Sequence, residues 1–140
     1  MDETPKTYSR IYYVKSGEAY CNIESDTIKL EKNSLYIFPL NSSYKIKHNP
    51  NIPLDHMWFH AETSPPINKL IVIRNIKDNL ALLILKALDQ MIFDHIDCEL
   101  ENKQLEILLE ILLDKYKIDI TIHKCVEKFW IIFIKIITKK

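Results

Sequence analysis

Glycine is almost absent from this chain, and its shortage excludes a large class of binding site. The 140 residues include one glycine, Gly17, where average composition would give about ten. Phosphate-binding loops need several glycines, because the backbone must approach the phosphate closely. Neither a GxGxxG nor a P-loop pattern is present. The sequence therefore argues against the common glycine-rich nucleotide-binding folds.

Arginine and paired cysteines are also scarce. The formal charge is zero, from 19 basic and 19 acidic residues, and only Arg10 and Arg74 are arginines. A DNA-reading domain usually carries a basic face rich in arginine, which the chain as a whole lacks. Cys21, Cys98 and Cys125 lie far apart, so the sequence suggests neither a zinc knuckle nor a disulfide framework. Reduced thiols in a cytoplasmic protein are the expectation.

Long hydrophobic runs are missing too. The first 20 residues are too polar for a signal peptide. The longest apolar run, 129–137, is interrupted by Lys135 and is shorter than the roughly 20 residues that span a bilayer. We therefore expect no membrane association.

What the chain does contain, in residues 1–75, is a series of short strands separated by turn residues. The pattern predicts strands at Tyr8–Lys15, Glu18–Glu24, Thr27–Leu30, Leu35–Leu40, Tyr44–Lys47, Leu54–Glu62 and Ile67–Ile73. Asn33 stands in one of the turns, where asparagine tolerates the left-handed conformation that glycine would otherwise supply. Short strands at this spacing indicate a β-sandwich or a β-barrel.

Residues 76–120 have a helical period and a net charge of −5. We expect one helix from Asp78 to about Ile96, apolar over more than half its circumference and so covered on two sides. A second helix is expected over Glu99–Lys117. Its main stripe consists of Leu105, Leu108, Leu109, Leu112, Leu113 and Tyr116. A separate ridge of Leu100, Ile107 and Ile111 is predicted to meet a two-fold partner.

Residues 121–140 carry a net charge of +4 and are expected to form a C-terminal helix or tail. The segment 129–134 is too apolar to remain in water as a monomeric tail. It could dock on the barrel, be buried in a dimer, or be the remnant of a domain that is no longer encoded.

Three segments in order resemble the N-terminal ligand-binding and dimerisation domain of bacterial AraC-type transcriptional regulators. They are RIYYVKSGE at 10–18, IKLEKNSLYIFP at 28–39 and MWFH at 57–60, followed by the two amphipathic helices. The resemblance covers Tyr8 to about Lys117. It implies an α+β fold, in which a cupin-like antiparallel β-barrel (jelly roll) is followed by two or three helices that form a homodimer.

The resemblance has departures that limit what it implies. Asn33 and Ser34 stand where the family usually has Gly-Asp, and Tyr44 stands near a frequent histidine position. The two helix-turn-helix motifs of the family's DNA-binding region are absent, because the sequence stops at Lys140. We therefore expect no sequence-specific DNA binding by this chain.

The residues offer little support for catalysis or metal binding. Cupin enzymes hold a metal through clustered histidines, and the first hairpin, 12–20, contains none. His56 and His60 form the only close pair, and on a strand they would lie about 13 Å apart, too far to share one ion. Cys21 alternates with Ala19 and Ile23, which favours a core position. We expect no metal, no cofactor and no catalytic residue.

Large polar-tipped side chains on the strands are the candidates for ligand binding, since a pocket for a small polar molecule needs apolar walls and a few convergent polar groups. These candidates are Arg10, Tyr12, Tyr20, Tyr36, Phe38, Trp58 and His60. The alternative is that these rings simply fill a small barrel. The sequence thus predicts a non-enzymatic domain that senses a small-molecule effector, such as a sugar, and that forms a dimer. The alternatives are a metal-free cupin enzyme such as a sugar isomerase, and a purely structural dimerisation module.

Overall fold

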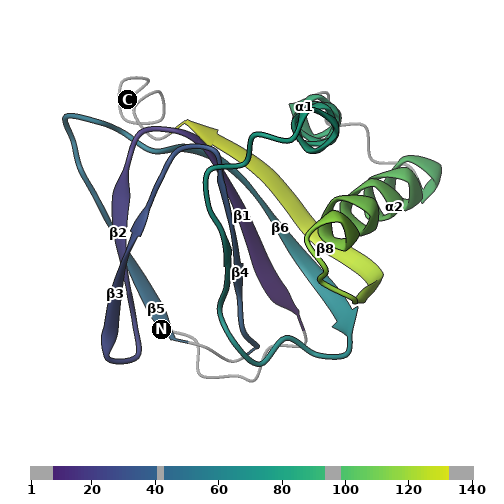
Figure 1. Ribbon diagram of the computed structural model, residues 1–140, viewed down its shortest axis with the longest axis horizontal. Coiled ribbons are helices and arrows are strands. Elements are labelled where there is room, and N and C mark those ends of the chain that lie inside the picture. Colours follow the sequence, from purple (N-terminus) through teal and green to yellow (C-terminus); the bar gives the residue numbers. More distant parts are fainter. Residues whose placement is uncertain (1–7, 41–42, 94–98, 133–140) are drawn as a thin grey trace.

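A computed structural model describes residues 8–40, 43–93 and 99–132, with the backbone alone described at 93, 99–102 and 123–132. Within these ranges the chain forms an α+β fold with a curled antiparallel β-structure and two helices (Figure 1). The strands are β1 (Ser9–Ser16), β2 (Ala19–Ile23), β3 (Asp26–Leu30), β4 (Ser34–Phe38), β5 (Tyr44–His48), β6 (Asp55–Ser64), β7 (Ile71–Ile73) and β8 (Thr121–Ile132). The helices are α1 (Asn79–Phe93) and α2 (Glu99–Lys115).

The strands form two antiparallel sheets that face each other. One sheet has five strands in the order β7-β4-β1-β6-β8, and the other has three in the order β3-β2-β5. The helices lie on the outer side of the five-stranded sheet, away from the three-stranded sheet (Figure 1). The five-stranded sheet is therefore the middle layer, and its central strands are covered on both faces.

Two hydrophobic clusters follow from this layering, and they separate by strand parity. Ile11 and Tyr13 of β1 belong to the cluster under the helices. Tyr12 and Val14 belong to the cluster between the sheets. Because successive side chains on a strand point to opposite faces, each central strand supplies both clusters.

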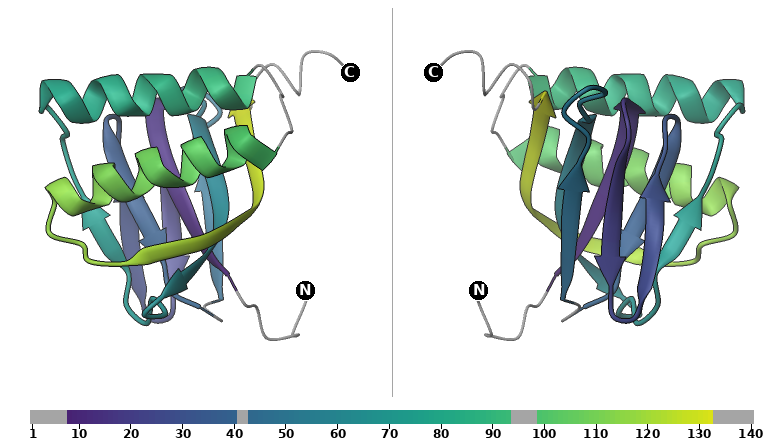
Figure 2. Two further views of the ribbon diagram at one scale, coloured as in Figure 1. Left: turned by 90° about the vertical axis from the view of Figure 1, so that its right-hand side faces the viewer. Right: turned by 90° about the vertical axis from the view of Figure 1, so that its left-hand side faces the viewer.

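The helices run side by side across the five-stranded sheet (Figure 2). The main stripe of α2 is buried, with Leu105, Leu109, Leu112 and Leu113 inaccessible to solvent. On α1 the buried side is formed by Ala81, Ile84, Leu85, Leu88 and Ile92. The expectation that α1 is covered on two sides is wrong for the described chain, since Leu80 and Leu83 are 50% and 64% exposed. None of the described helices is long and apolar enough to cross a membrane.

The C-terminal segment differs from the expected helix or tail. Residues 121–132 form strand β8, which pairs antiparallel with β6 from Ser64↔Thr121 to Asp55↔Ile132. Isoleucine, valine, threonine and aromatic residues are frequent here, and they favour a pleated, half-buried strand. Of the three fates that the sequence left open for 129–134, the part up to Ile132 docks on the sheet. Residues 133–140 lie outside the described chain.

The backbone is left-handed at several described residues, and contacts at Asn33 and Gly17 show why the chain takes this conformation there. Asn33 has φ 60°, as its place in a turn predicts, and its side chain accepts a hydrogen bond from Tyr13. Gly17 has φ 83°, and a Cβ atom there would overlap the carbonyl group of Pro53. The only glycine in the sequence therefore stands where the backbone of another segment leaves no room for a side chain.

Candidate functional site

Six of the seven predicted ligand-binding residues come together on the inner face of the five-stranded sheet. The register aligns them in two rows that run across β4, β1 and β6. One row is Phe38, Arg10 and His60, and the next is Tyr36, Tyr12 and Trp58. Directly opposed residues in such rows have Cβ atoms about 5 Å apart, so the six side chains form one compact block.

Tyr20, the seventh predicted residue, lies apart from this block, and its predicted place in the interior is wrong. Its side chain is 44% exposed, while its neighbours Ala19 and Cys21 are buried between the sheets. Strand parity explains the difference, because Ala19, Cys21 and Ile23 occupy the inner face of β2 and force Tyr20 outward. The expected core position of Cys21 is confirmed.

Arg10 makes a polar contact across the interior. Its Nη1 donates a hydrogen bond of 2.7 Å to the hydroxyl of Tyr44, which reaches across from the three-stranded sheet. The hydroxyl oxygens of Tyr44 and Tyr12 lie 3.4 Å apart. No carboxylate pairs with Arg10 within the described chain, and its buried Nε has no hydrogen-bond partner there. The guanidinium therefore keeps hydrogen-bonding capacity that the described residues leave unused.

The surroundings keep this pair in one protonation state. Burial raises the pKa of Tyr44 far above its usual value and outweighs the opposite effect of Arg10. Burial also acts to lower the pKa of Arg10, but the hydrogen bond that Arg10 donates to Tyr44 and the nearby phenols reverse this effect, and the net shift is upward. At neutral pH the pair is thus a cation beside a neutral phenol.

Aromatic rings surround this pair in stacked contacts. Phe38 stacks on Tyr44 with ring centroids 4.3 Å apart. The ring of His60 lies 4.2 Å from Tyr8 and 4.6 Å from Trp58. These flat faces, each with a polar atom nearby, supply the apolar walls and polar tips that a small polar ligand requires.

His56 is a buried interior residue that the sequence analysis considered for metal binding but did not include among the candidate ligand-binding residues. It stacks on Tyr12 with ring centroids 5.1 Å apart, and its Nδ1 has no hydrogen-bond partner among the described residues. Burial, with smaller contributions from His48 and Lys15, lowers its pKa to about 4. The imidazole is therefore neutral at pH 7. Its parity on β6, shared with Trp58 and His60, was the signal that could have identified it.

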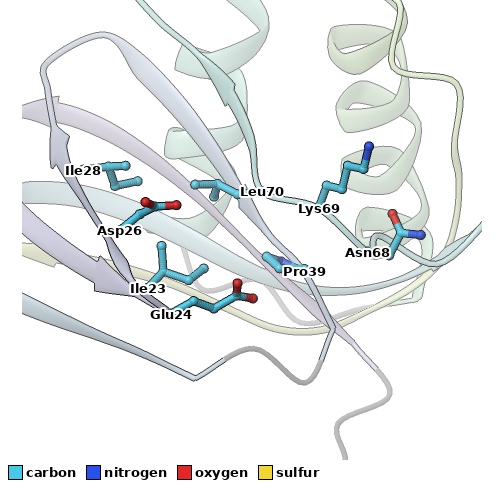
Figure 3. Close-up of a pocket in the computed structure, with 8 residues that line it drawn as sticks. All are labelled: Ile23, Glu24, Asp26, Ile28, Pro39, Asn68, Lys69 and Leu70. Carbon is cyan, nitrogen blue, oxygen red and sulfur yellow. The ribbon is translucent and has the colours of Figure 1, made fainter.

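A cavity of about 270 Å³ opens between the β2–β3 hairpin and the segment that leads into β7. Figure 3 shows its lining, which combines Ile23, Ile28 and Leu70 with the carboxylates of Glu24 and Asp26, and also includes Pro39, Asn68 and Lys69. Ile23 pairs with Tyr44 across β2 and β5, and Pro39 follows Phe38 in the chain. The cavity therefore lies beside the Phe38–Tyr44 stack, at one end of the interior block.

The arrangement does not bring metal ligands together. Within the described residues, no group of three histidine, cysteine or acidic side chains is placed to hold a metal ion. His56 and His60 share a face of β6 but contact different rings. Burial raises the pKa of the Cys21 thiol to about 11, so it remains protonated at neutral pH.

The helical ridge predicted for the dimer is partly described. Ile107 and Ile111 are 57% and 44% exposed, while the side chain of Leu100 lies outside the described chain. The exposed ridge of α2 is thus separate from the main stripe of the same helix, which is buried against the sheet.

Comparison with known proteins gives no further guidance. No protein-family model, no curated protein and no solved structure matches this chain. Its function is therefore inferred from the side chains that line the interior and the helix surface.

Proposed function

We propose that the protein is a small-molecule-binding module of the effector-sensing kind found in AraC-type regulators. In this proposal the curled β-structure is a cupin-like jelly roll, and the effector lies between the two sheets beside Arg10. The observation that supports it most directly is the contrast between the two faces of one sheet. The face under the helices is filled mainly by aliphatic residues, whereas the inner face carries Arg10, two histidines, two tyrosines and Trp58.

The contrast favours a ligand because a structural core has no need of such groups. Burying a guanidinium or an imidazole costs free energy unless its polar atoms are satisfied. The aliphatic face shows that the same strands can supply an ordinary core. Arg10 and Tyr44 would bind hydroxyl or carboxylate oxygens, and Trp58 would stack on a ring. A small polar ring compound such as a sugar fits this chemistry, and it would enter past the cavity in Figure 3.

We further propose a homodimer through the α2 ridge. Ile107 and Ile111 are exposed, and in an antiparallel arrangement Ile107 of one copy would face Ile111 of the other. The same register would place Lys103 opposite the turn that carries Asp114 and Lys115, both exposed, and Lys115 already has an ion pair with Asp78. Opposite charges flanking an apolar centre are the self-complementary pattern that a two-fold axis requires.

A metal-free enzyme is the second candidate, and His56 is the observation that favours it. A buried imidazole that is neutral at pH 7 could accept a proton from a bound substrate. Its described neighbours are Tyr12, His48 and Lys15, so Tyr12 would be the group nearest to act as its acid partner. Replacing His56 with glutamine would abolish turnover in an enzyme but leave ligand affinity largely intact in a sensor.

The test is a binding screen that reports on the interior. A panel of pentoses, hexoses and aromatic carboxylates is added to ¹⁵N-labelled protein, and the indole N–H signals are followed. The Trp130→Phe variant assigns the signal of Trp58. We expect one ligand class to shift the Trp58 signal saturably and to raise the melting temperature.

Two arginine variants provide the matched control. Arg10→Met should abolish binding. Arg74→Met removes an exposed arginine that is paired with Glu31 and contacts the interior block through Tyr36 alone, so this variant should retain most of the binding. If no compound binds at millimolar concentration and Arg10→Met is more stable than the native chain, the interior is a filled core. The protein would then be a structural module.

A further inference from the structure

The outer face of the three-stranded sheet presents a cationic surface around one exposed aromatic ring. Tyr20 on β2 is paired with Lys29 on β3 and with Lys47 on β5. The next outward row is Thr27, Asn22 and Lys45. We name Tyr20, Asn22, Lys29, Lys45 and Lys47 the Tyr20 face. Among the described elements no helix covers it, because both helices lie on the far side of the five-stranded sheet (Figures 1 and 2).

The side chains of this face are available to a partner. Tyr20 is 44% exposed, and Lys45 and Lys47 are exposed with no ion pair to any described residue. Lys29 is 3.3 Å from Glu18 and also interacts with Glu31, so these carboxylates neutralise part of its charge, and Lys45 and Lys47 carry most of the positive charge of the face. Adjacent strands are about 4.8 Å apart, so the row from Lys29 through Tyr20 to Lys47 spans about 10 Å. A flat ring thus lies between two cations at a fixed spacing.

The charge of the whole molecule reinforces this surface. Residues 76–120, which include both helices, have five basic and ten acidic side chains. The helical layer and the Tyr20 face are on opposite sides of the protein (Figure 1). A polyanion approaching the protein would therefore be repelled from the helices and attracted to the Tyr20 face or to the segment 121–140, which has a net charge of +4, and substitution at Tyr20 distinguishes these two sites.

We propose that the Tyr20 face binds single-stranded nucleic acid without sequence preference. One base would stack on the ring of Tyr20, and the neighbouring phosphates would contact Lys45 and Lys47. Stacking on an aromatic side chain tolerates every base, because each base has a π-face, and lysines beside the ring follow the backbone. The face has no aliphatic residue to insert into a membrane, and an acidic peptide would make no use of the exposed ring. This activity is independent of the interior ligand site and of any sequence-specific recognition of duplex DNA.

The test measures fluorescence anisotropy of a 5′-fluorescein-labelled dodecathymidylate in 50 mM NaCl. We expect a dissociation constant on the order of 10⁻⁵ M, within the range of non-specific binding. Tyr20→Ala should weaken binding about tenfold, whereas Tyr20→Phe, which keeps the ring, should bind like the native protein. The Lys45→Gln/Lys47→Gln double variant should bind more weakly. The slope of the logarithm of its binding constant against the logarithm of the salt concentration should be smaller in magnitude by about 1.4.

Controls separate this proposal from its rivals. The Lys77→Gln/Lys86→Gln variant removes two exposed lysines outside the Tyr20 face and should bind like the native protein; circular dichroism checks that every variant is folded. The proposal is overturned if Tyr20→Ala binds as well as the native chain. It is also overturned if a labelled oligoglutamate or a duplex of equal length binds as tightly as the single strand, or if no probe binds at all.

Discussion

Arg10 and Tyr44 join the two sheets across the interior through a hydrogen bond of 2.7 Å. Arg10 lies on β1 and Tyr44 on β5, strands that belong to different sheets. The guanidinium also lies over the Tyr44 ring, with its carbon 5.5 Å from the ring centroid. The contact is thus both a hydrogen bond and a cation–π interaction, and it connects two layers that the strand ladders leave separate.

This contact should contribute measurably to stability. Tyr44→Phe keeps the ring stack with Phe38 but removes the acceptor of the Arg10 hydrogen bond. Leaving a buried donor unsatisfied costs about 1–3 kcal/mol, so the free energy of unfolding in urea should fall by that amount. Tyr20→Phe removes an exposed hydroxyl and should change it by less than about 0.5 kcal/mol. Equal stability of the two variants would contradict the structural role of the pair.

His56 should make the protein less stable in mild acid. Its pKa is about 4 in the folded chain and about 6.5 when unfolded. Between these values the unfolded state binds a proton that the folded state does not, so stability is full above pH 6.5 and declines as the pH falls to 4. The shift corresponds to about 3 kcal/mol. Urea midpoints measured from pH 7.5 to 4 should show this decline.

The matching variant for this experiment is His56→Phe, which keeps a flat ring against Tyr12. Over the same pH range the free energy of unfolding of the variant should fall by about 3 kcal/mol less than that of the native chain. Parallel curves for the two proteins would show that His56 is not the group responsible.

Gly17 should not tolerate a side chain. Alanine at this position would carry the strain of φ 83° and overlap the Pro53 carbonyl group. Strain of this kind costs about 1–3 kcal/mol, and the overlap adds to it, so Gly17→Ala should lower the urea midpoint clearly. Glu24→Gly, at another left-handed residue with φ 55°, is the control and should be close to neutral. A Gly17→Ala chain as stable as the native one would be inconsistent with the tight approach of Pro53.

The two apolar surfaces of α2 should respond oppositely to charge. Ile107→Lys/Ile111→Lys changes exposed positions and should give a folded monomer, because like charges would meet across the two-fold axis. Leu109→Lys places a charge in a fully buried position and should unfold the domain. Light scattering and circular dichroism distinguish these outcomes. A ridge variant that remains dimeric would assign the interface to another surface.

Much of the β-structure was predictable because strand parity leaves a direct trace in the sequence. The strands at Tyr44–His48 and Asp26–Leu30 differ from expectation by one residue at one end. Parity also brought Arg10, Tyr12 and Trp58 to one face, as expected for neighbouring strands. The same rule, applied to Ala19, Cys21 and Ile23, would have placed Tyr20 outside.

The remaining differences depend on tertiary contacts that no local pattern contains. The composition of residues 121–132 is compatible with a helix or a strand. Pairing with β6, which is far away in the sequence, stabilises the strand. Of the expected strand 67–73, Ile71–Ile73 pairs with β4, whereas Ile67 accepts a backbone hydrogen bond from Leu40 outside the strand. Tyr44 was marked only as a departure from the family pattern, since its role depends on reaching Arg10 from the opposite sheet.

The pairing of β6 with β8 also sets the order in which the fold can be completed. Ser64 and Thr121 are partners although both helices lie between them in the chain. Contacts of such long range are entropically expensive to close and slow folding. During synthesis the edge of β6 stays unpaired until β8 has left the ribosome, and an unpaired edge is a template for aggregation. A chain cut before Thr121 should therefore express chiefly as insoluble material, even with the interior block intact.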